Sequence, residues 1–391
     1  MSDNYDLTIK AAFTGYIVQA IVNNFLPLLF VQMQTEFGIP LSLITLLITI
    51  NFLIQLLVDL LSTPVIERIG YRGSMIVSNS CAIIGFILLT CLPGIFKNHF
   101  IGILIPVIIY AIGGGLQEVL VSPIVEACPT KNKESTMSLL HSFYCWGHMA
   151  VVILSTVFFR FAGITNWRII AIAWTVVPLA DLILFTFVPI AEFEKSSDEV
   201  SGGWKSLFST GFFWIVMLMM LCAGASEQAV SQWASVFAEK GLGVTKQLGD
   251  ILGPMLFAFC MGTSRAIYGV RGHKLDLRKF MYVSVILCIG AYAVIIVSTN
   301  PVVTLLACGL VGFSVGIFWP GTFSLASAGM KGGTLMFALL ALAGDLGCSA
   351  GPALAGVVMS VSGRSMKFGI GAAVIFPIVM LLGLRFIRSR K

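Results

Sequence analysis

The sequence predicts an all-α integral membrane protein whose twelve transmembrane helices form two pseudo-symmetric six-helix bundles. Of its 391 residues, 58% are hydrophobic and 11% are charged, whereas a soluble domain has about 25% charged residues. About twelve apolar runs are long enough to cross the hydrocarbon core of a membrane, which takes about 20 residues in a helix. The longest polar stretch, 190–208, has six of these runs on each side.

Each apolar run is interpreted as a helix because, in lipid, every backbone N–H and C=O group must be hydrogen-bonded within the protein. In order, the predicted spans are 9–32, 42–65, 74–94, 101–127, 137–160, 167–189, 211–237, 247–269, 279–298, 302–328, 333–360 and 367–387. The polar stretch at the midpoint divides the chain into an amino-terminal bundle, a cytoplasmic linker and a carboxy-terminal bundle, which are residues 1–189, 190–208 and 209–391.

The distribution of basic residues predicts the orientation in the membrane. Sixteen of the 24 Lys and Arg residues fall on the side of the amino terminus and seven on the other side, with Arg265 inside a span. Because basic loops stay in the cytoplasm, we expect a multi-pass protein of the plasma (inner) membrane with both termini cytoplasmic. This asymmetry accounts for the net charge of +6, so we expect membrane lipids and no nucleic acid as partners.

The nine cysteines lie within or at the ends of apolar runs, with no CxxC pair and no nearby group of histidines. We therefore expect neither a disulfide framework nor a metal site. No cofactor is expected either, apart from a coupling ion, H⁺ or Na⁺.

Charged residues inside the predicted spans are the first candidates for function, because a charge near the bilayer centre costs about 3 kcal/mol. Glu118 lies in the middle of the fourth span, where it could carry a proton as a coupling group. The alternative is a protonated glutamate that only bonds a neighbouring helix. Asp59 lies nearer the cytoplasmic end of the second span, where gating or helix capping is expected.

Polar residues also follow one face of the seventh span. Polar and aromatic residues recur there with three- and four-residue spacing, namely Glu227, Gln228, Ser231, Gln232 and Trp233. This spacing favours one helical face with Glu227, Ser231, Gln228 and Gln232 that meets water or a ligand. Arg265 in the eighth span needs a carboxylate partner, for which Glu227 and Asp345 are the candidates. Both a structural ion pair and a pair opened by substrate remain open.

Two further residues in the second half have a binding and a packing interpretation. Asp345 lies in a run of small residues that lets helices approach closely. Because packing does not explain the charge, ion or solute binding stands beside a helix-to-helix hydrogen bond. Trp319, followed by Pro320, occupies the tenth span, where its ring could stack on a sugar or only pack against neighbours.

The segment after the second span, Thr63-Pro-Val-Ile-Glu67-Arg68-Ile-Gly70-Tyr-Arg72, is similar to the loop signature of the major facilitator superfamily. In that signature a glycine precedes Asp-Arg-x-Gly and further basic residues. The resemblance implies two six-helix bundles around a midplane site. It also implies that Glu67, Arg68 and Arg72 form a charge latch that gates the inward and outward states.

A second motif resembles the fucose permease branch of the superfamily. Gly115-Leu-Gln-Glu118-Val-Leu-Val-Ser-Pro123 matches its fourth span, and Leu139-Leu-His141-Ser-Phe-Tyr144-Cys-Trp-Gly147 matches its fifth. The resemblance places Glu118 on the coupling glutamate, His141 on a glutamine and Tyr144 on an asparagine. The aspartate of the family's first span is absent, and Asn23 or Asn24 stands there before Leu26-Pro27, which leaves sodium open as the coupling ion.

These observations predict a secondary active transporter that moves a small polar solute, in the first place a sugar, by alternating access. An exporter of amphipathic compounds and a carrier of organic or amino acids are the alternatives within transporters. A membrane sensor or an enzyme without flux is the alternative from another class, but no clustered nucleophile or phosphate-binding glycine loop points to an enzyme. We expect no catalytic residues and a monomer.

Overall fold

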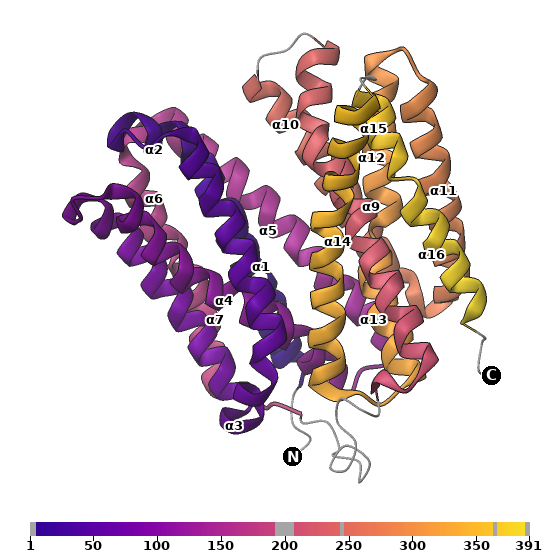
Figure 1. Ribbon diagram of the computed structural model, residues 1–391. Helices are drawn as coiled ribbons and strands as arrows, with labels where there is room; N and C mark the ends of the chain where they lie inside the picture. Colours follow the sequence, from indigo (N-terminus) through magenta and orange to yellow (C-terminus); the bar gives the residue numbers. More distant parts are fainter. Residues whose placement is uncertain (1–4, 192–206, 243–245, 363–365, 388–391) are drawn as a thin grey trace. The chain divides into compact units, whose positions relative to one another are not determined.

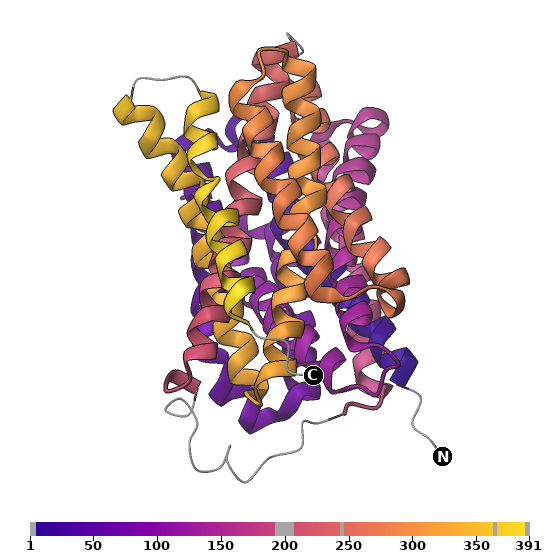
Figure 2. The same cartoon turned by 90° about the vertical axis from the view of Figure 1, so that its right-hand side faces the viewer.

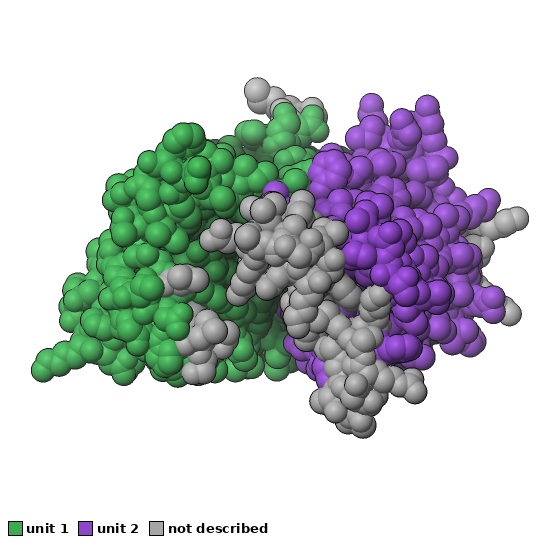
Figure 3. Space-filling model, turned by 90° about the horizontal axis from the view of Figure 1, so that it is seen from above, with its two compact units in different colours: residues 1–129, 143–193 green, residues 130–142, 194–391 purple. Residues whose placement is uncertain are grey.

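The computed structural model describes residues 5–191, 207–242, 246–362 and 366–387, and every regular element in these ranges is a helix. The chain divides into two compact units, coloured separately in Figure 3. Unit 1 contains residues 1–129 and 143–193, and unit 2 contains residues 130–142 and 194–391. Most of the predicted linker lies outside the described residues, so its role as the domain boundary stays a prediction. Residues 130–142 group with unit 2, although the predicted amino-terminal bundle included them.

In its described residues, the first half of the chain forms seven α-helices, labelled in Figure 1, and two short 3₁₀ turns. They are α1 (Tyr5–Asn24), η1 (Leu26–Leu29), α2 (Phe30–Phe37), α3 (Leu41–Ile95), α4 (His99–Ala127), α5 (Lys133–Ala162), η2 (Ile164–Asn166), α6 (Trp167–Trp174) and α7 (Val176–Phe187). In unit 1, α4 packs along both α1 and α3, and α7 packs on α1 and α3.

The described helices of the second half belong to unit 2. They are α9 (Gly211–Leu242), α10 (Lys246–Arg271), η3 (Gly272–Lys274), α11 (Leu277–Val297), α12 (Pro301–Val315), α13 (Phe318–Gly329), α14 (Gly333–Ser362), α15 (Met366–Ala372) and α16 (Ile375–Phe386). Helix α14 packs along α9, and the orange pair α11 and α12 runs side by side in Figures 1 and 2.

All twelve predicted spans correspond to helical segments, but the number of membrane crossings is smaller when counted by length and hydropathy. Within the described residues, ten helical stretches are long and apolar enough to cross a membrane. One of them, Leu46–Ile95, is 50 residues long and covers two predicted spans, since about 20 residues suffice for one. The junction is Gly70, whose φ of 73° and ψ of 168° interrupt the helix. Helix α10, which matches the eighth predicted span, is not among the ten.

Four predicted spans are interrupted, and each interruption is followed closely by a proline. The breaks lie after Asn24, at Thr175, at Gly316 and Ile317, and near Val374, and the prolines are Pro27, Pro178, Pro320 and Pro377. Proline has no N–H for the carbonyl four residues earlier, and its ring clashes with that carbonyl. The helix therefore opens one turn before each proline.

Glycines of α4 let the helices of unit 1 approach closely. A Cβ on Gly113 would lie 2.6 Å from the carbonyl oxygen of Ser78, and one on Gly115 would lie 3.1 Å from Cα of Gln55. Both positions face α3, whereas Gly114 faces Val22 of α1 at 2.8 Å. Residues on these three helices are therefore within hydrogen-bond reach of each other.

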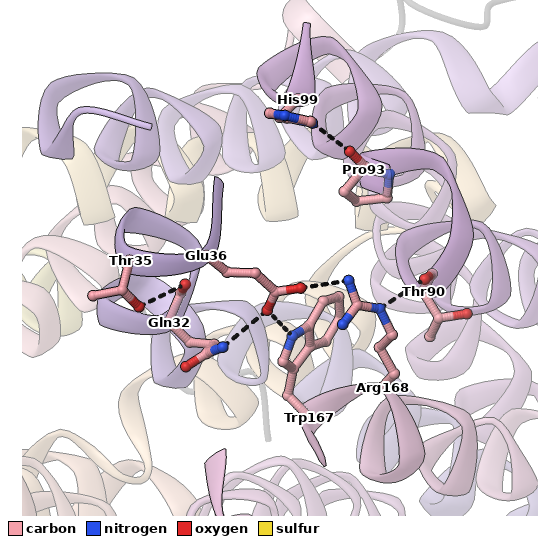
Figure 4. A network of polar contacts seen from close by, with 8 residues as sticks. All are labelled: Gln32, Thr35, Glu36, Thr90, Pro93, His99, Trp167 and Arg168. Atoms are coloured by element: carbon pink, nitrogen blue, oxygen red, sulfur yellow. Dashed lines mark hydrogen bonds and ion pairs between the residues drawn. The ribbon is translucent and has the colours of Figure 1, made fainter. Parts of the chain in front are cut away.

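A polar network joins α2 to α6 and to the end of α3 (Figure 4). The Glu36 carboxylate accepts hydrogen bonds from Gln32 at 2.8 Å and from the Trp167 indole at 2.9 Å, and it forms an ion pair with Arg168. Arg168 also donates to the carbonyl of Thr90 and lies 4.6 Å from the Trp167 ring. These contacts hold the short α2 against the rest of unit 1.

Candidate functional site

A cluster of neutral carboxamides joins α1 to α3 in unit 1. The Asn23 Oδ1 atom accepts hydrogen bonds from Gln55 Nε2 at 2.7 Å and Asn51 Nδ2 at 3.2 Å. Asn23 is partly exposed, whereas Asn51 and Gln55 are buried. Asn24 does not join this cluster, because its amide donates to the carbonyl of Ala20 in its own helix.

Glu118 lies on the neighbouring face of unit 1 and is held by a neutral partner. Gln19 Nε2 of α1 donates to Glu118 Oε2 at 2.6 Å, and Glu118 itself is partly exposed. One turn further along α4, Ser122 exchanges a hydrogen bond with the hydroxyl of Tyr16 at 3.1 Å. The predicted bond from Glu118 to a neighbouring helix is thus present, and its partial exposure leaves the carboxylate accessible to a proton or solute.

Arg265 of unit 2 is buried and forms the predicted pair with Glu227. Its Nη2 lies 3.4 Å from Glu227 Oε2, its Nε donates to the carbonyl of Gly316 at 2.8 Å, and its Nη1 donates to the carbonyl of His141 at 3.2 Å. The carbonyl of Gly316 needs such a donor because Pro320, four residues later, has no N–H. The break between α12 and α13 therefore creates one of the acceptors that hold the guanidinium.

His141 is buried at the same place, on the part of α5 that belongs to unit 2. Its ring centroid lies 5.7 Å from that of Phe323 on α13, and its carbonyl binds Arg265. The adjacent turn of α5 is fixed by Ser138, whose hydroxyl donates to the carbonyl of Arg265 at 2.8 Å. His141 therefore belongs to the Arg265 group, while Tyr144, one turn further on, is partly exposed and belongs to unit 1.

The packing interpretation of Trp319 has direct support. The indole lies over the backbone of Gly344, where a Cβ would come within 2.2 Å of the ring, and only 8% of the residue is exposed. Asp345 follows Gly344 and is partly exposed, as is Gln228, while Gln232 is exposed. Contacts of these three residues with a solute stay a prediction.

The residues of the predicted charge latch have separate positions in unit 1. Arg72 donates to the carbonyls of Phe185 at 2.9 Å, Thr186 at 2.6 Å and Val188 at 2.8 Å, and thereby caps the carboxyl end of α7. Glu67 and Arg68 are exposed on α3, and Asp59 is buried within it. Their gating role stays a prediction, because these contacts describe one state of one unit.

Among the described residues, no group of three or more His, Cys, Asp or Glu side chains could hold a metal ion.

The family model of the major facilitator superfamily matches residues 11–352. The chain belongs to this superfamily. No curated protein is significantly similar to it in sequence. Two similar solved structures are sugar symporters. The fucose:proton symporter FucP of E. coli is 14% identical, with a TM-score of 0.81 over 98% of this chain and 99% of that chain. The proton:xylose symporter XylE is 13% identical, with a TM-score of 0.82 over 98% and 95%.

A third similar structure has a different substrate class. The human organic anion transporter TETRAN is 15% identical, with a TM-score of 0.76 over 99% of this chain and 100% of that chain. At these identities the likeness concerns the fold alone. The predicted membership of the superfamily and the all-helical, two-bundle fold class are confirmed.

Asn51 and Gln55 of the carboxamide cluster are not among the site residues predicted from the sequence. Asn51 and Gln55 stand four residues apart in an apolar span, with Asp59 four residues later, so all three lie on one helical face. This four-residue spacing could have identified a polar helical face from the sequence alone.

Proposed function

We propose that the protein is a secondary active transporter that moves a small polar solute, in the first place a sugar, by alternating access coupled to H⁺. The observation that carries this proposal is the carboxamide cluster of Asn23, Asn51 and Gln55. It lies one turn of α1 from Gln19, which donates to the partly exposed Glu118. Amides donate and accept hydrogen bonds without charge, as the hydroxyl groups of a sugar require. The two symporters of similar fold, one for fucose and one for xylose, support the sugar class.

Glu118 is the proposed proton carrier. Gln19, which donates to Glu118 Oε2, is a neutral amide and can hydrogen-bond the carboxyl group in both its protonated and its ionised form. Sodium is the alternative coupling ion, because Asn23 offers a neutral oxygen where a carboxylate would favour a proton. The proposal further includes a monomer without catalytic activity or cofactor, in the plasma membrane with both termini in the cytoplasm.

The test uses purified protein in liposomes that enclose a pH-sensitive dye. A panel of sugars, amino acids and organic acids is added outside, and wild type is compared with Glu118→Gln. We expect one sugar to acidify the lumen, and we expect Glu118→Gln to abolish this proton movement. Asp6→Asn, which removes an exposed carboxylate of α1, is the control and should leave the signal unchanged.

The other outcomes are equally informative. Solute entry without proton movement, or normal coupling in Glu118→Gln, would show that Glu118 is not the proton carrier. Repeating the assay with a sodium gradient then separates sodium coupling from facilitated diffusion. If no solute of the panel is transported, an exporter of amphipathic compounds or a sensor becomes the leading hypothesis.

An organic anion is the second candidate solute, and Arg265 is the observation that favours it. The contact of Arg265 with Glu227 is 3.4 Å long, beyond the usual range of about 2.7–2.9 Å for a charge-assisted hydrogen bond, so an anionic solute could take the place of Glu227. Arg265→Gln should then abolish transport while Asn51→Ala leaves it intact. A sugar carrier is expected to lose most transport in Asn51→Ala.

A further inference from the structure

Unit 1 contains a second acidic group that the site described above does not use. Asp181 of α7 is completely buried, and its Oδ2 atom accepts hydrogen bonds from Asn79 Nδ2 of α3 at 2.9 Å and from Gln117 Nε2 of α4 at 3.4 Å. Gln117 Nε2 also donates to Asn79 Oδ1 at 3.0 Å. Three helices thus converge on one carboxyl group.

The two oxygens of Asp181 are in different environments. Oδ2 accepts from two amides, whereas Oδ1 is buried without a hydrogen-bond partner among the described residues. A carboxylate would leave part of its charge on an unbonded oxygen in the interior of the unit, which costs several kcal/mol in an apolar medium. In a neutral carboxylic acid, Oδ2 is the carbonyl oxygen that accepts both bonds, and Oδ1 is the hydroxyl group.

Charged groups on the surrounding helices have described contacts elsewhere. Arg72 of α3 binds the carbonyls at the end of α7, and Arg168 of α6 pairs with Glu36. Glu118 of α4 accepts from Gln19, and the Tyr16 hydroxyl of α1 bonds Ser122. The two side chains that donate to Asp181, those of Asn79 and Gln117, are neutral amides.

We propose that Asp181 is a second proton-binding site of unit 1, which holds a proton at neutral pH and exchanges it during the coupling cycle together with Glu118. The first span has Asn23 and Asn24 at the place where a second acid was expected, and Asp181 supplies that acid from the sixth predicted span. Gln117, which donates to Asp181, directly precedes Glu118 in α4, so the same turn of α4 carries Glu118 and a hydrogen-bond donor of Asp181. The role in coupling rests on the proposed transport function, while the bound proton does not.

Infrared spectroscopy of the purified protein in lipid tests the bound proton without any solute. At neutral pH we expect a carbonyl-stretch band of a protonated carboxyl group that persists in Glu118→Gln and is lost in Asp181→Asn. An identical spectrum for wild type and Asp181→Asn would overturn the proposal. Asn79→Ala removes one donor to Oδ2 and should move the band without removing it, which serves as the test if Asp181→Asn does not fold.

Proton stoichiometry tests the part in coupling. In liposomes with a transported solute, Asp181→Asn should move fewer protons per solute molecule than wild type. An unchanged ratio would refute the role in coupling even if the infrared band disappears. If the band is lost in Asp181→Asn but no solute of the panel is transported, the proton site stands and the proposed transport function fails.

Discussion

Glu118 and Asp181 of unit 1 and Glu227 of unit 2, all within predicted spans, have hydrogen-bond partners of different kinds. In unit 1, Glu118 and Asp181 accept hydrogen bonds from the side chains of glutamine and asparagine, which carry no charge. In unit 2, Glu227 faces the guanidinium of Arg265, which also binds two backbone carbonyls. The amides that donate to Glu118 and Asp181 can hydrogen-bond a carboxyl group in both protonation states, whereas Glu227 has a permanent cation as a partner.

This difference separates two tasks. A group that carries protons must become neutral and charged in turn, and an amide partner costs little in either state. An arginine cannot lose its proton in a protein, so protonation of Glu227 would leave a buried cation without its counter-charge. We infer that proton binding belongs to unit 1 and that the pair in unit 2 supports structure or an anionic ligand.

The largest expected effect is at the charged pair of unit 2. Arg265→Gln removes the partner of Glu227 and the donor to Gly316 and His141, and we expect a loss of about 3 kcal/mol in the free energy of unfolding. Unfolding with denaturant in mixed micelles measures it. The matched change in unit 1, Glu118→Gln, should cost at most about 1 kcal/mol, because an amide can keep the bond to Gln19. Equal losses at the two positions would refute the contrast between the units.

Much of the fold could be read from the sequence because the membrane imposes a simple rule. A run of about 20 apolar residues must be helical in lipid, so all twelve predicted spans were found as helical segments. The interruptions were harder to place. Pro27, Pro178, Pro320 and Pro377 coincide with breaks, whereas α4 contains Pro106 and Pro123 and continues. Whether a proline opens a helix depends on neighbours that can bind the freed carbonyl.

The site could be predicted only where one residue carries a strong signal. Glu118 and Arg265 stand out as charges inside apolar spans. The need for a counter-charge left Glu227 and Asp345 as candidate partners of Arg265, and the structure pairs it with Glu227. Asp181 is also an ionisable residue inside an apolar span, but its environment depends on Asn79, which is 102 positions away in the sequence. Such partners become visible only when the packing of three helices is known.

A smaller effect is expected at the Glu36 network of unit 1. Partial burial alone would raise the pKa of Glu36, but the hydrogen bonds from Gln32, Trp167 and Arg168, together with the charge of Arg168, lower it below its ordinary value of 4.5. This network therefore stabilises the fold above that pH, and its contribution is lost as the pH falls through the lowered pKa. Because the ion pair is partly exposed, Glu36→Gln should cost about 1 kcal/mol at neutral pH.

Thermal unfolding of wild type and Glu36→Gln in detergent, measured from neutral to acidic pH, checks this prediction. The difference between the two midpoints should shrink on acidification below pH 4.5. Glu67→Gln, which changes an exposed carboxylate of α3, should show little difference at any pH. A difference between the unfolding midpoints of wild type and Glu36→Gln that grows on acidification would contradict the lowered pKa of Glu36.

The smallest effect concerns arginine side chains that donate to carbonyl groups at the carboxyl end of a helix, which occur in both units. Arg72 donates to three carbonyls at the end of α7, and Arg278 of α11 donates to one, that of Leu384 in α16, at 2.9 Å. A cation at a helix carboxyl end contributes about 0.3–1 kcal/mol. We expect Arg72→Met to cost about 1 kcal/mol and Arg278→Met about half of that, because fewer hydrogen bonds are lost. Denaturant unfolding of the two variants measures the ratio. Equal losses would mean that the charge at the helix end, and not the number of hydrogen bonds, determines the stabilisation in both units.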